Sequence, residues 1–429
     1  MTPPEFKFEW NKFADQPHNV APRSERTRHH FRHWRTYFSL VGSNLARGLP
    51  ALPAYRRNKK RMFHTAVPME RGMFGVSVSP PGPAREDEIV ALLKRAGVVR
   101  TLVRAASWER DKLPELERFV RRLRAAGLDV MIAVLHRRQD VFEPSVWRGF
   151  LEEVFVRLSD GPTAFEIGHA WNRTKWGVWD YTEYLDLAGP AFELGPKYGA
   201  VLVGPAVIDF EFHLYPPTLK RLPFDKVSSL LYVDRVGAPE NAQAGWTTTK
   251  KIALLKAVAD RAAGRPKDCW ITEVNWPLQG TGKYSPASGK PNVTEEEQAD
   301  FFVRYHLLAL AGGLIERVYW WQLVAPGYGL IDSRETPWRA RPSFHALRTL
   351  VETVAGAGFT GGTLEDGVHV FRFQKDGRRF AACWTTGPPV ERDLGEPVAE
   401  VIGRDGERSA AESSRLMIEG SPKYAFFAL

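Results

Sequence analysis

The sequence predicts an α/β protein: a (β/α)8, or TIM, barrel with a basic N-terminal extension and a small C-terminal antiparallel β domain. Three observations support this prediction: short apolar runs alternate with amphipathic helical patterns, the alternation is long, and it stops abruptly near the C-terminus. Eight strand–helix units over about 250 residues match the size of a closed parallel barrel. An open doubly wound sheet usually has fewer strands, and no G-x-G-x-x-G follows the first strand to indicate a dinucleotide site.

The strands are predicted from short runs rich in β-branched and aromatic residues. Helical patterns between them, such as AREDEIVALLKRAG and TTTKKIALLKAVADRAAG, are charged on one face, apolar on the other, and end in glycine. The eight expected strands are 73–78, 99–105, 128–135, 162–168, 199–207, 225–233, 268–276 and 316–323.

The pattern changes after RPSFHALRTLVETVAGAG, where the last helix is expected. Beyond it, short alternating runs such as VHVFRFQ and RFAACWTT are separated by turn residues, which is typical of an antiparallel sheet. We therefore expect three parts: a basic N-terminal arm over residues 1–71, the barrel over 72–352, and a β-sandwich-like domain over 358–429.

The positive charge of the chain is concentrated in the arm. The formal net charge is +9, and residues 23–71 carry twelve Lys or Arg against two acids. Basic and aromatic residues are interleaved there, as in RSERTRHHFRHWRTYF, which is typical of segments that lie on phosphate-rich surfaces. An anionic membrane or lipopolysaccharide surface is therefore one expected partner, and a solvated extension that wraps the barrel is the alternative. Nucleic acid is disfavoured, because no reader motif accompanies the charge.

Composition also narrows the class of protein. The two cysteines, Cys269 and Cys383, provide no disulfide framework. The N-terminus lacks a basic segment followed by an apolar run, and no stretch approaches roughly 18 uninterrupted apolar residues. We expect a cytoplasmic protein, peripheral to the inner membrane if the arm binds lipid. No cluster has metal-ligand spacing, so we expect no metal and no cofactor.

Glu273 is the first candidate for chemistry, because barrel active sites lie at the carboxyl ends of the strands. It sits near the end of the apolar run WITEVNWP. A carboxylate that emerges from such a run is not an ordinary surface charge, since parallel strands are buried on both faces. It is either a structural partner of a buried cation, for which Arg104 is suited, or a nucleophile that such a cation keeps ionised. The two interpretations are compatible.

The ends of two strands carry a resemblance to a known group of enzymes. Residues 165–172 read F-E-I-G-H-A-W-N and residues 271–273 read I-T-E. The clan of retaining glycosidases with a (β/α)8 barrel reads W-E-I-G-N-E-P-N and I-T-E at these places, and the chain is most similar to its β-xylosidase and α-L-iduronidase branch. The resemblance spans roughly residues 72–350, and that branch also has a trailing β domain.

The resemblance implies a carbohydrate-binding cleft and a glycoside hydrolase-like activity on a polysaccharide or glycoconjugate. Glu273 matches the nucleophile, Arg104 and Tyr232 match residues that surround it, and Trp320 or Trp321 matches the tryptophan that floors the sugar subsite. Further candidates for contact with the carbohydrate lie at or just beyond other strand ends: His136, Asn172, Arg173, Asp234 and Trp276.

The chain departs from the clan where proton transfer is expected. The clan's Asn-Glu pair binds the 2-hydroxyl group and protonates the leaving group, whereas this chain has His169 and Ala170 there. Leu230 replaces a histidine that the branch usually has two residues before the tyrosine. Another group would then have to transfer the proton: His169, which titrates near neutral pH, or one of the carboxyls Asp209, Glu211 and Asp234.

Two alternatives need no such group. Arg173 and Lys175 could hold an anionic leaving group that departs without a proton, or the chain could be a non-catalytic carbohydrate-binding or assembly protein on the same scaffold. The distance between carboxyls separates these hypotheses. A second carboxyl about 5–5.5 Å from Glu273 would fit a retaining enzyme, and about 6.5–9.5 Å an inverting one.

Overall fold

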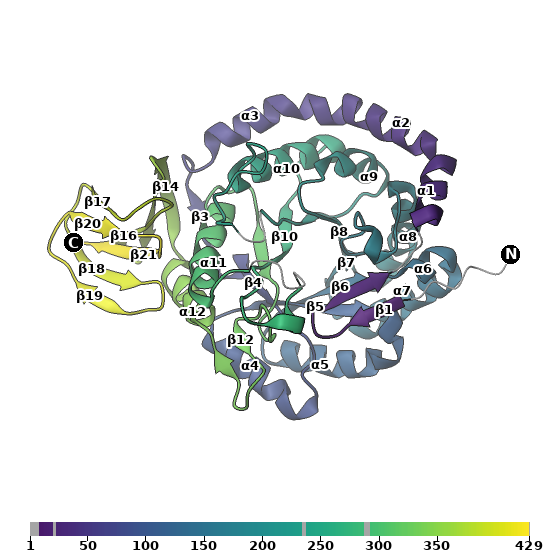
Figure 1. Ribbon diagram of the computed structural model, residues 1–429, viewed down its shortest axis with the longest axis horizontal. Coiled ribbons are helices and arrows are strands. Elements are labelled where there is room, and N and C mark those ends of the chain that lie inside the picture. Colours follow the sequence, from purple (N-terminus) through teal and green to yellow (C-terminus); the bar gives the residue numbers. More distant parts are fainter. Residues whose placement is uncertain (1–7, 20–22, 234–236, 287–291, 429) are drawn as a thin grey trace.

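The computed structural model describes residues 8–19, 23–233, 237–286 and 292–428. Its centre is a closed barrel of eight parallel strands, which confirms the predicted fold class (Figure 1). Each barrel strand overlaps the run from which it was predicted. The strands are β4 (Phe74–Ser77), β5 (Arg100–Ala106), β6 (Asp129–Leu135), β7 (Ala164–Ile167), β8 (Val201–Ile208), β9 (Lys226–Leu230), β10 (Cys269–Val274) and β11 (Arg317–Trp320).

The main barrel helices follow the strands and cover the outside of the barrel. Local sequence sets several of their ends: the Asp180 side chain accepts backbone bonds at the start of α8, and Thr294 forms a capping box with Glu297 at the start of α11. Gly264 ends α10 at φ 71°, which suits glycine. These helices are α4 (Glu86–Arg95), α5 (Leu113–Ala125), α6 (Arg138–Phe142), α7 (Pro144–Leu158), α8 (Tyr181–Leu194), α9 (Tyr215–Arg221), α10 (Thr248–Ala263), α11 (Glu295–Leu310) and α12 (Pro342–Val354).

Alternation along the strands separates two apolar regions. On β5, Val103 faces the helices, whereas Leu102 joins a smaller cluster inside the barrel. On β10, Ile271 packs outward and Trp270 inward. Strict alternation would then turn Glu273 outward, but the register of β10 against β11 shifts between Ile271 and Val274. This irregularity returns Val274 to the outer layer and leaves Glu273 facing the mouth of the barrel.

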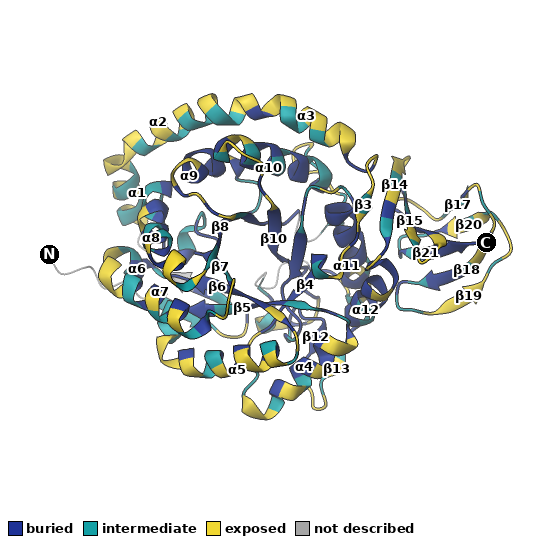
Figure 2. Ribbon diagram, turned by 180° about the vertical axis from the view of Figure 1, so that it is seen from behind, coloured by how far each residue is buried: buried dark blue, intermediate teal, exposed yellow. Residues whose placement is uncertain are grey.

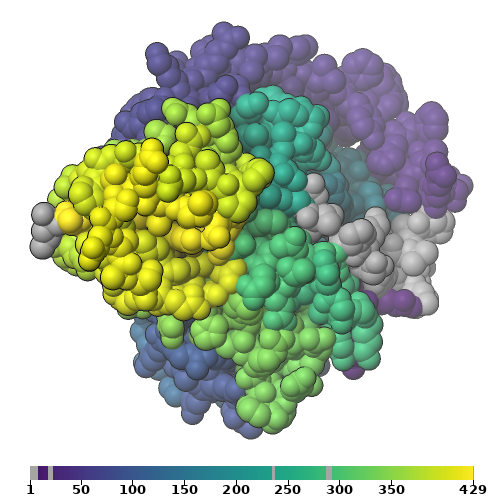
Figure 3. All heavy atoms as spheres, turned by 60° about the vertical axis from the view of Figure 1, so that its left-hand side comes forward, coloured from purple at the N-terminus to yellow at the C-terminus, as the bar shows by residue number. Residues whose placement is uncertain are grey.

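The C-terminal part is an antiparallel sheet that packs beside the barrel, next to α11 and α12 (Figures 1 and 3). Its order is β19-β18-β21-β16-β15-β14-β3, and a separate pair, β17 and β20, accompanies it. One face of the sheet joins the main core through Phe371 and Trp384, while Ala381 and Cys383 belong to a second, smaller core. The strands are β14 (Gly358–Glu365), β15 (Val368–Lys375), β16 (Arg378–Thr385), β17 (Val390–Asp393), β18 (Val398–Gly403), β19 (Arg408–Ala410), β20 (Arg415–Ile418) and β21 (Lys423–Phe427).

The N-terminal arm has three pieces. A hairpin of β1 (Phe8–Asn11) and β2 (Gln16–Asn19) lies near the barrel mouth. Helices α1 (Arg23–Arg32), α2 (Trp34–Ser43) and α3 (Leu52–Arg61) then form an arc around the outside of the barrel, over α9 and α10 (Figures 1 and 2). The short strand β3 (Val67–Pro68) finally joins the edge of the C-terminal sheet by pairing with β14. The arm thus wraps the barrel.

Candidate active site

A cavity of about 180 Å³ opens at the carboxyl ends of the barrel strands. Both the strand ends and the N-terminal hairpin contribute to its wall. The lining residues are Ala14, Asp15, Gln16, Arg104, His169, Ala170, Arg173, Lys175, Trp176, Ile208, Tyr232, Glu273, Asn275, Pro277, Pro286, Trp321 and Tyr328.

Glu273 is the buried carboxylate of this cavity. Tyr232 donates a hydrogen bond from its hydroxyl to Oε1 at 2.6 Å, and Arg104 donates one from Nη2 to Oε2 at 2.5 Å. Burial alone would raise the pKa of Glu273, but the contacts with His169, Arg104 and Tyr232 outweigh it and lower that pKa to about 2. The carboxylate is therefore ionised at neutral pH and both of its oxygens are held in place.

Arg104 is the central cation of the cavity. Its guanidinium carbon lies 3.3 Å from the centre of a Trp321 ring, a cation–π contact. Nη1 donates to Asp15 Oδ2 at 2.9 Å, while Nη2 also lies 3.1 Å from His169 Nε2. One guanidinium thus binds two carboxylates, Asp15 and Glu273.

His169 occupies the cavity wall beside these charges, 3.2 Å from Glu273 Oε2. Burial and the charge of Arg104 lower its pKa, with Glu273 acting in the opposite direction. Within the described ranges its Nδ1 has no hydrogen-bond partner. This environment favours the neutral imidazole, which disfavours His169 as the group that donates a proton. Ala170, at the place of the clan's acid, is fully buried and has φ 44°.

Arg173 lines the cavity and forms ion pairs with Asp209 and Glu211. Two of the three carboxyls expected as alternative acids, Asp209 and Glu211, are therefore paired with one arginine. Asp234, the third, lies outside the described residues. Asn172 does not line the cavity; its side chain makes two bonds, 2.9 and 3.0 Å, with the backbone of Ile208 at the end of β8.

Of the three tryptophan candidates, one lines the cavity and two lie in the core between the barrel and its helices. Trp321 lines the cavity, whereas Trp320 is completely buried and packs on Phe302 of α11 with ring centres 4.7 Å apart. Trp276 stacks on Trp320 in the same outer layer, at 5.9 Å. The structure therefore places Trp321, and neither Trp320 nor Trp276, where it can touch a ligand in this cavity.

Two further polar groups lie below the cavity. His136 is fully buried, outside the cavity lining, and burial lowers its pKa to about 3. Glu166 accepts a hydrogen bond from Thr272 at 2.6 Å, and burial raises its pKa to about 7. Both belong to the interior of the barrel.

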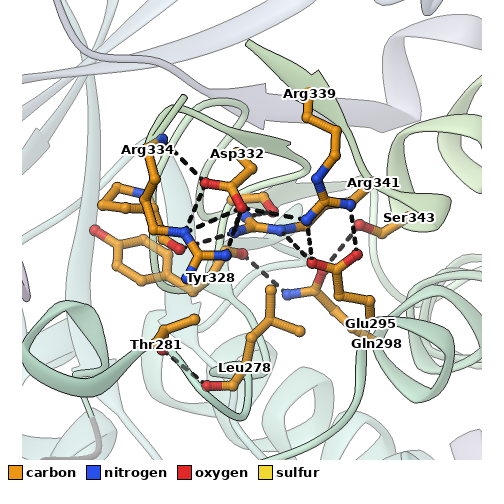
Figure 4. Close-up of polar contacts among 12 residues, drawn as sticks. Leu278, Thr281, Glu295, Gln298, Tyr328, Asp332, Arg334, Arg339, Arg341 and Ser343 are labelled. Carbon is orange, nitrogen blue, oxygen red and sulfur yellow. Dashed lines mark hydrogen bonds and ion pairs between the residues drawn. The ribbon is translucent and has the colours of Figure 1, made fainter. Parts of the chain in front are cut away.

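The loop after β11 brings Tyr328 to the cavity. Hydrogen bonds from Arg341 hold this loop in place (Figure 4). Arg341 is fully buried and donates to the carbonyl groups of Ala325, Pro326 and Gly329 at 2.7–2.9 Å. Glu295 and Asp332 balance its charge. The last barrel helix, α12, begins immediately after this arginine.

The hairpin of β1 and β2 contributes residues to the cavity wall, and the sequence did not predict this contribution. Trp10 packs on Trp108 and Trp176, with ring centres 4.9 and 6.1 Å apart, and Lys175 donates to Gln16 at 2.6 Å. No recognised motif marks residues 8–19, and the expected arm was described by its basic residues, which begin after the hairpin. The one available signal was that the first 22 residues carry three acids, including Asp15, against two bases.

Across the described ranges, a single group of His, Cys, Asp or Glu side chains could hold a metal ion: His29, His33 and Asp180, with candidate ligand atoms within 4.8 Å of one another. His29 stacks on His33 at 4.1 Å and bonds Asp180 at 2.7 Å. These contacts join α1 to the start of α8, so they have a role in docking the arm. The expectation of no metal remains a prediction.

No protein-family model and no curated protein sequence matches the chain. Solved structures do match. A family 39 glycoside hydrolase from Bacteroides cellulosilyticus has a TM-score of 0.62 and 16% identity, covering 86% of this chain and 82% of that one. A family 30 endoxylanase from Clostridium papyrosolvens has 0.57 and 13%, covering 86% and 99%. A family 51 arabinofuranosidase from Xanthomonas axonopodis has 0.57 and 12%, covering 85% and 97%. At these identities the likeness establishes the fold.

Proposed function

We propose that the chain is a glycosidase that acts on a polysaccharide or glycoconjugate through a covalent intermediate at Glu273. The observation that carries the proposal is an ionised, almost fully buried carboxylate at the base of a cavity, held by Tyr232 and Arg104. Retaining glycosidases need such a nucleophile. The similarity in fold to glycoside hydrolases of families 39, 30 and 51 supports the same class of reaction.

In this reaction we assign a role to each neighbour of Glu273. An oxygen of Glu273 attacks the anomeric carbon while the bond to the leaving-group oxygen breaks. Arg104 and Tyr232 keep the carboxylate ionised and oriented, since each holds a different oxygen. The rings of Trp176, Trp321 and Tyr328 line the cavity and offer apolar surface to the faces of a sugar.

Trapping of the glycosyl-enzyme tests the nucleophile without requiring an acid. We expect 2,4-dinitrophenyl 2-deoxy-2-fluoro-glycosides of xylose, arabinose or glucose to add one fluoroglycosyl mass to the wild type, because dinitrophenolate departs without a proton. Glu273→Gln should gain no mass, and the label should map to the peptide that contains residue 273. The measurement is intact-protein mass spectrometry followed by peptide mapping.

Glu316→Gln is the matched control, since Glu316 lies next to the start of β11 at the opposite end of the barrel. It should label like the wild type. Absence of an adduct with every sugar would contradict the proposal and favour the second candidate function, a non-catalytic carbohydrate-binding or assembly protein. The observation that favours this second candidate is that Ala170 provides no carboxyl at the place of the clan's acid.

We further propose that the arm binds an anionic membrane surface, as the basic composition suggests. Helices α1–α3 expose apolar side chains three or four residues apart, including Phe31 at 75% and Phe38 at 70% exposure. Such a contiguous apolar stripe is uncommon on a soluble protein, and together with flanking basic residues it fits an amphipathic helix lying in a lipid interface. The exposed apolar residues of the arc are Phe31, Trp34, Tyr37, Phe38, Val41, Leu45, Leu49 and Leu52.

The charge of the arc complements anionic lipid. From residue 23 to residue 61 the only acid is Glu25, and exposed bases flank the stripe. None of the helices within the described ranges combines the length and apolar character that a bilayer crossing requires. With its exposed apolar stripe toward the lipid, the arc would lie on the surface of the membrane.

Vesicle sedimentation checks this prediction. Full-length protein should bind phosphatidylcholine vesicles that contain phosphatidylglycerol more strongly than vesicles of phosphatidylcholine alone. Phe38→Ser should weaken binding about tenfold or more, because an inserted phenylalanine contributes about 1.5–3 kcal/mol. Val156→Ser, which removes an apolar residue that is 59% exposed from α7, should leave binding unchanged. Equal binding to both vesicle types, or none to either, would contradict the proposal.

A further inference from the structure

We infer that Asp15, carried by the N-terminal hairpin, is the proton-transferring carboxyl of this site, in place of the carboxyl that Ala170 lacks. The inference rests on the proposed function, because it assumes that Glu273 forms the glycosyl-enzyme. It assigns a catalytic role to a segment outside the barrel.

The first argument is the shared guanidinium. Arg104 donates from Nη1 to Asp15 at 2.9 Å and from Nη2 to Glu273 at 2.5 Å. Because the guanidinium is small and planar, the two carboxylate oxygens lie within about 8 Å of each other. That upper bound allows the separation of about 5–5.5 Å that a retaining glycosidase uses.

The second argument is the position of Asp15 between two cavities. It lines the cavity that contains Glu273 and also a neighbouring cavity of about 460 Å³. Arg104 and Tyr328 line both as well, so the two spaces meet beside these three residues. A sugar at Glu273 with its leaving group in the second cavity would have its glycosidic oxygen near this junction. The Asp15 side chain is 22% exposed, so it is accessible from the cavities.

The third argument is that the hairpin is held in place by the barrel. Trp10 packs between Trp108 and Trp176, and Phe13 packs on Tyr284 with ring centres 5.6 Å apart. These contacts flank the turn that carries Asp15, which itself adopts φ 52°. A turn anchored on both sides can present a carboxyl in a fixed orientation.

The charges around the two carboxyls support different protonation states. Burial raises the pKa of Asp15 and Arg104 opposes it, while the charges of Glu273 and Glu109 raise it further and a contact with Tyr328 lowers it. Glu273 has a lowered pKa in the same cavity. A pair of carboxyls whose environments separate their pKa values is the arrangement that an acid and a nucleophile require.

With Asp15 as the proton-transferring group, the reaction proceeds in two steps that return both carboxyls to their starting states. As Glu273 bonds to the anomeric carbon, the Asp15 proton moves to the leaving-group oxygen and the glycosidic bond breaks. In the second step, the Asp15 carboxylate takes a proton from water, whose oxygen attacks the anomeric carbon and releases Glu273. Esterification of Glu273 removes its negative charge, which lowers the pKa of Asp15 and favours its role as a base in this step.

Asp15→Asn tests the role with two leaving groups on the sugar that labels Glu273. For the phenyl glycoside, whose leaving group departs slowly without a proton, we expect kcat/KM to fall by about 10²–10⁴. For the 2,4-dinitrophenyl glycoside, kcat/KM should change less than about fivefold, while the glycosyl-enzyme accumulates. Azide should restore turnover and yield the glycosyl azide of retained configuration. The basic limb of the pH profile should also disappear.

Glu9→Gln is the control, since it makes the same kind of change at an exposed position of the same hairpin. It should behave like the wild type. An equal loss for both leaving groups, no loss for either, or faster turnover in Asp15→Asn would overturn the inference, and the last result would identify the hairpin as a plug of the site. If no sugar labels Glu273, the proposed function fails. If a sugar labels Glu273 but Asp15→Asn shows no selective loss, only the inference about Asp15 fails, so the two failures are distinguishable.

A titration provides a readout independent of the sugar. In protein labelled with ¹³C at the aspartate carboxyls, the Asp15 signal, assigned by its loss in Asp15→Asn, should titrate above the usual value of 3.8. In Glu273→Gln its pKa should fall, because a repelling charge is removed and Arg104 can pair with Asp15 alone. An unchanged or higher pKa in Glu273→Gln would contradict the coupling of the two carboxyls.

Discussion

Arg104→Met is expected to lower the free energy of unfolding by about 3–5 kcal/mol near neutral pH. The substitution leaves Glu273 and Asp15 in the cavity without the cation that binds both of them. It also removes the cation–π contact with Trp321. Breaking a buried ion pair costs much more than breaking a surface pair, because the remaining charge has little water to solvate it. Urea unfolding followed by tryptophan fluorescence measures the difference.

The effect of Arg104→Met should depend on pH. In the wild type, the pKa of Glu273 is about 2, below its usual value of 4.5, so the stability this carboxylate contributes is fully present above pH 4.5 and is lost as the pH falls through about 2. Without Arg104 that pKa should rise, because only His169 and Tyr232 then oppose the effect of burial, and the carboxylate contributes less stability at neutral pH. The difference between wild type and variant should therefore shrink below about pH 3.

Arg122→Met is the matched control for this experiment. Arg122 and its partner Asp87 are exposed, and such pairs contribute about 0–1 kcal/mol. A loss for Arg104→Met no larger than that of Arg122→Met, or a loss that does not depend on pH, would contradict the role assigned to Arg104. Arg104→Met should also label more slowly with the fluoroglycosides, since Glu273 loses the cation that holds one of its oxygens.

Arg341→Met should destabilise the protein by a similar amount, about 3–5 kcal/mol, for a different reason. Arg341 is fully buried and satisfies the carbonyl groups of three residues in the loop after β11, as well as the carboxylates of Glu295 and Asp332 (Figure 4). Each buried carbonyl left without a donor costs about 1–3 kcal/mol unless water enters. Because the same loop carries Tyr328, labelling of Glu273 should slow as well.

The control for Arg341 is its neighbour. Arg339 contacts the same two carboxylates, Glu295 and Asp332, but is about half exposed. Arg339→Met should lower the free energy of unfolding by no more than about 1 kcal/mol. Chemical unfolding of both variants gives the comparison. Equal, small losses would show that the loop does not depend on Arg341.

The barrel was predictable from the sequence because each strand is a short apolar run buried on both faces, and each run is followed by an amphipathic helix. The site was predictable only in part. Glu273 and Arg104 end apolar runs, so their proximity followed from the fold. The choice between Trp320 and Trp321 did not, because the twist and irregularity at the strand end decide which ring faces the cavity.

Long-range contacts were beyond the reach of sequence patterns. The hairpin meets the barrel through Trp10 and Asp15, and neither residue belongs to a recognised motif. Similarly, β3 is only two residues long, Val67 and Pro68, with no alternation to reveal it. Such contacts depend on where distant segments come together in space, which local propensity does not encode.

The pairing of β3 with β14 has a consequence for how the protein is made. Val67 pairs with Phe359, and Met69 exchanges backbone bonds with Gly356 and Ala357 at 2.7 and 2.8 Å. During synthesis the N-terminal partner leaves the ribosome long before the strand it joins. The sheet edge can therefore form only after β14 has emerged, and contacts of such high sequence separation form slowly. Completion of this edge is thus expected to be a late step of folding, one that joins the first and last parts of the chain.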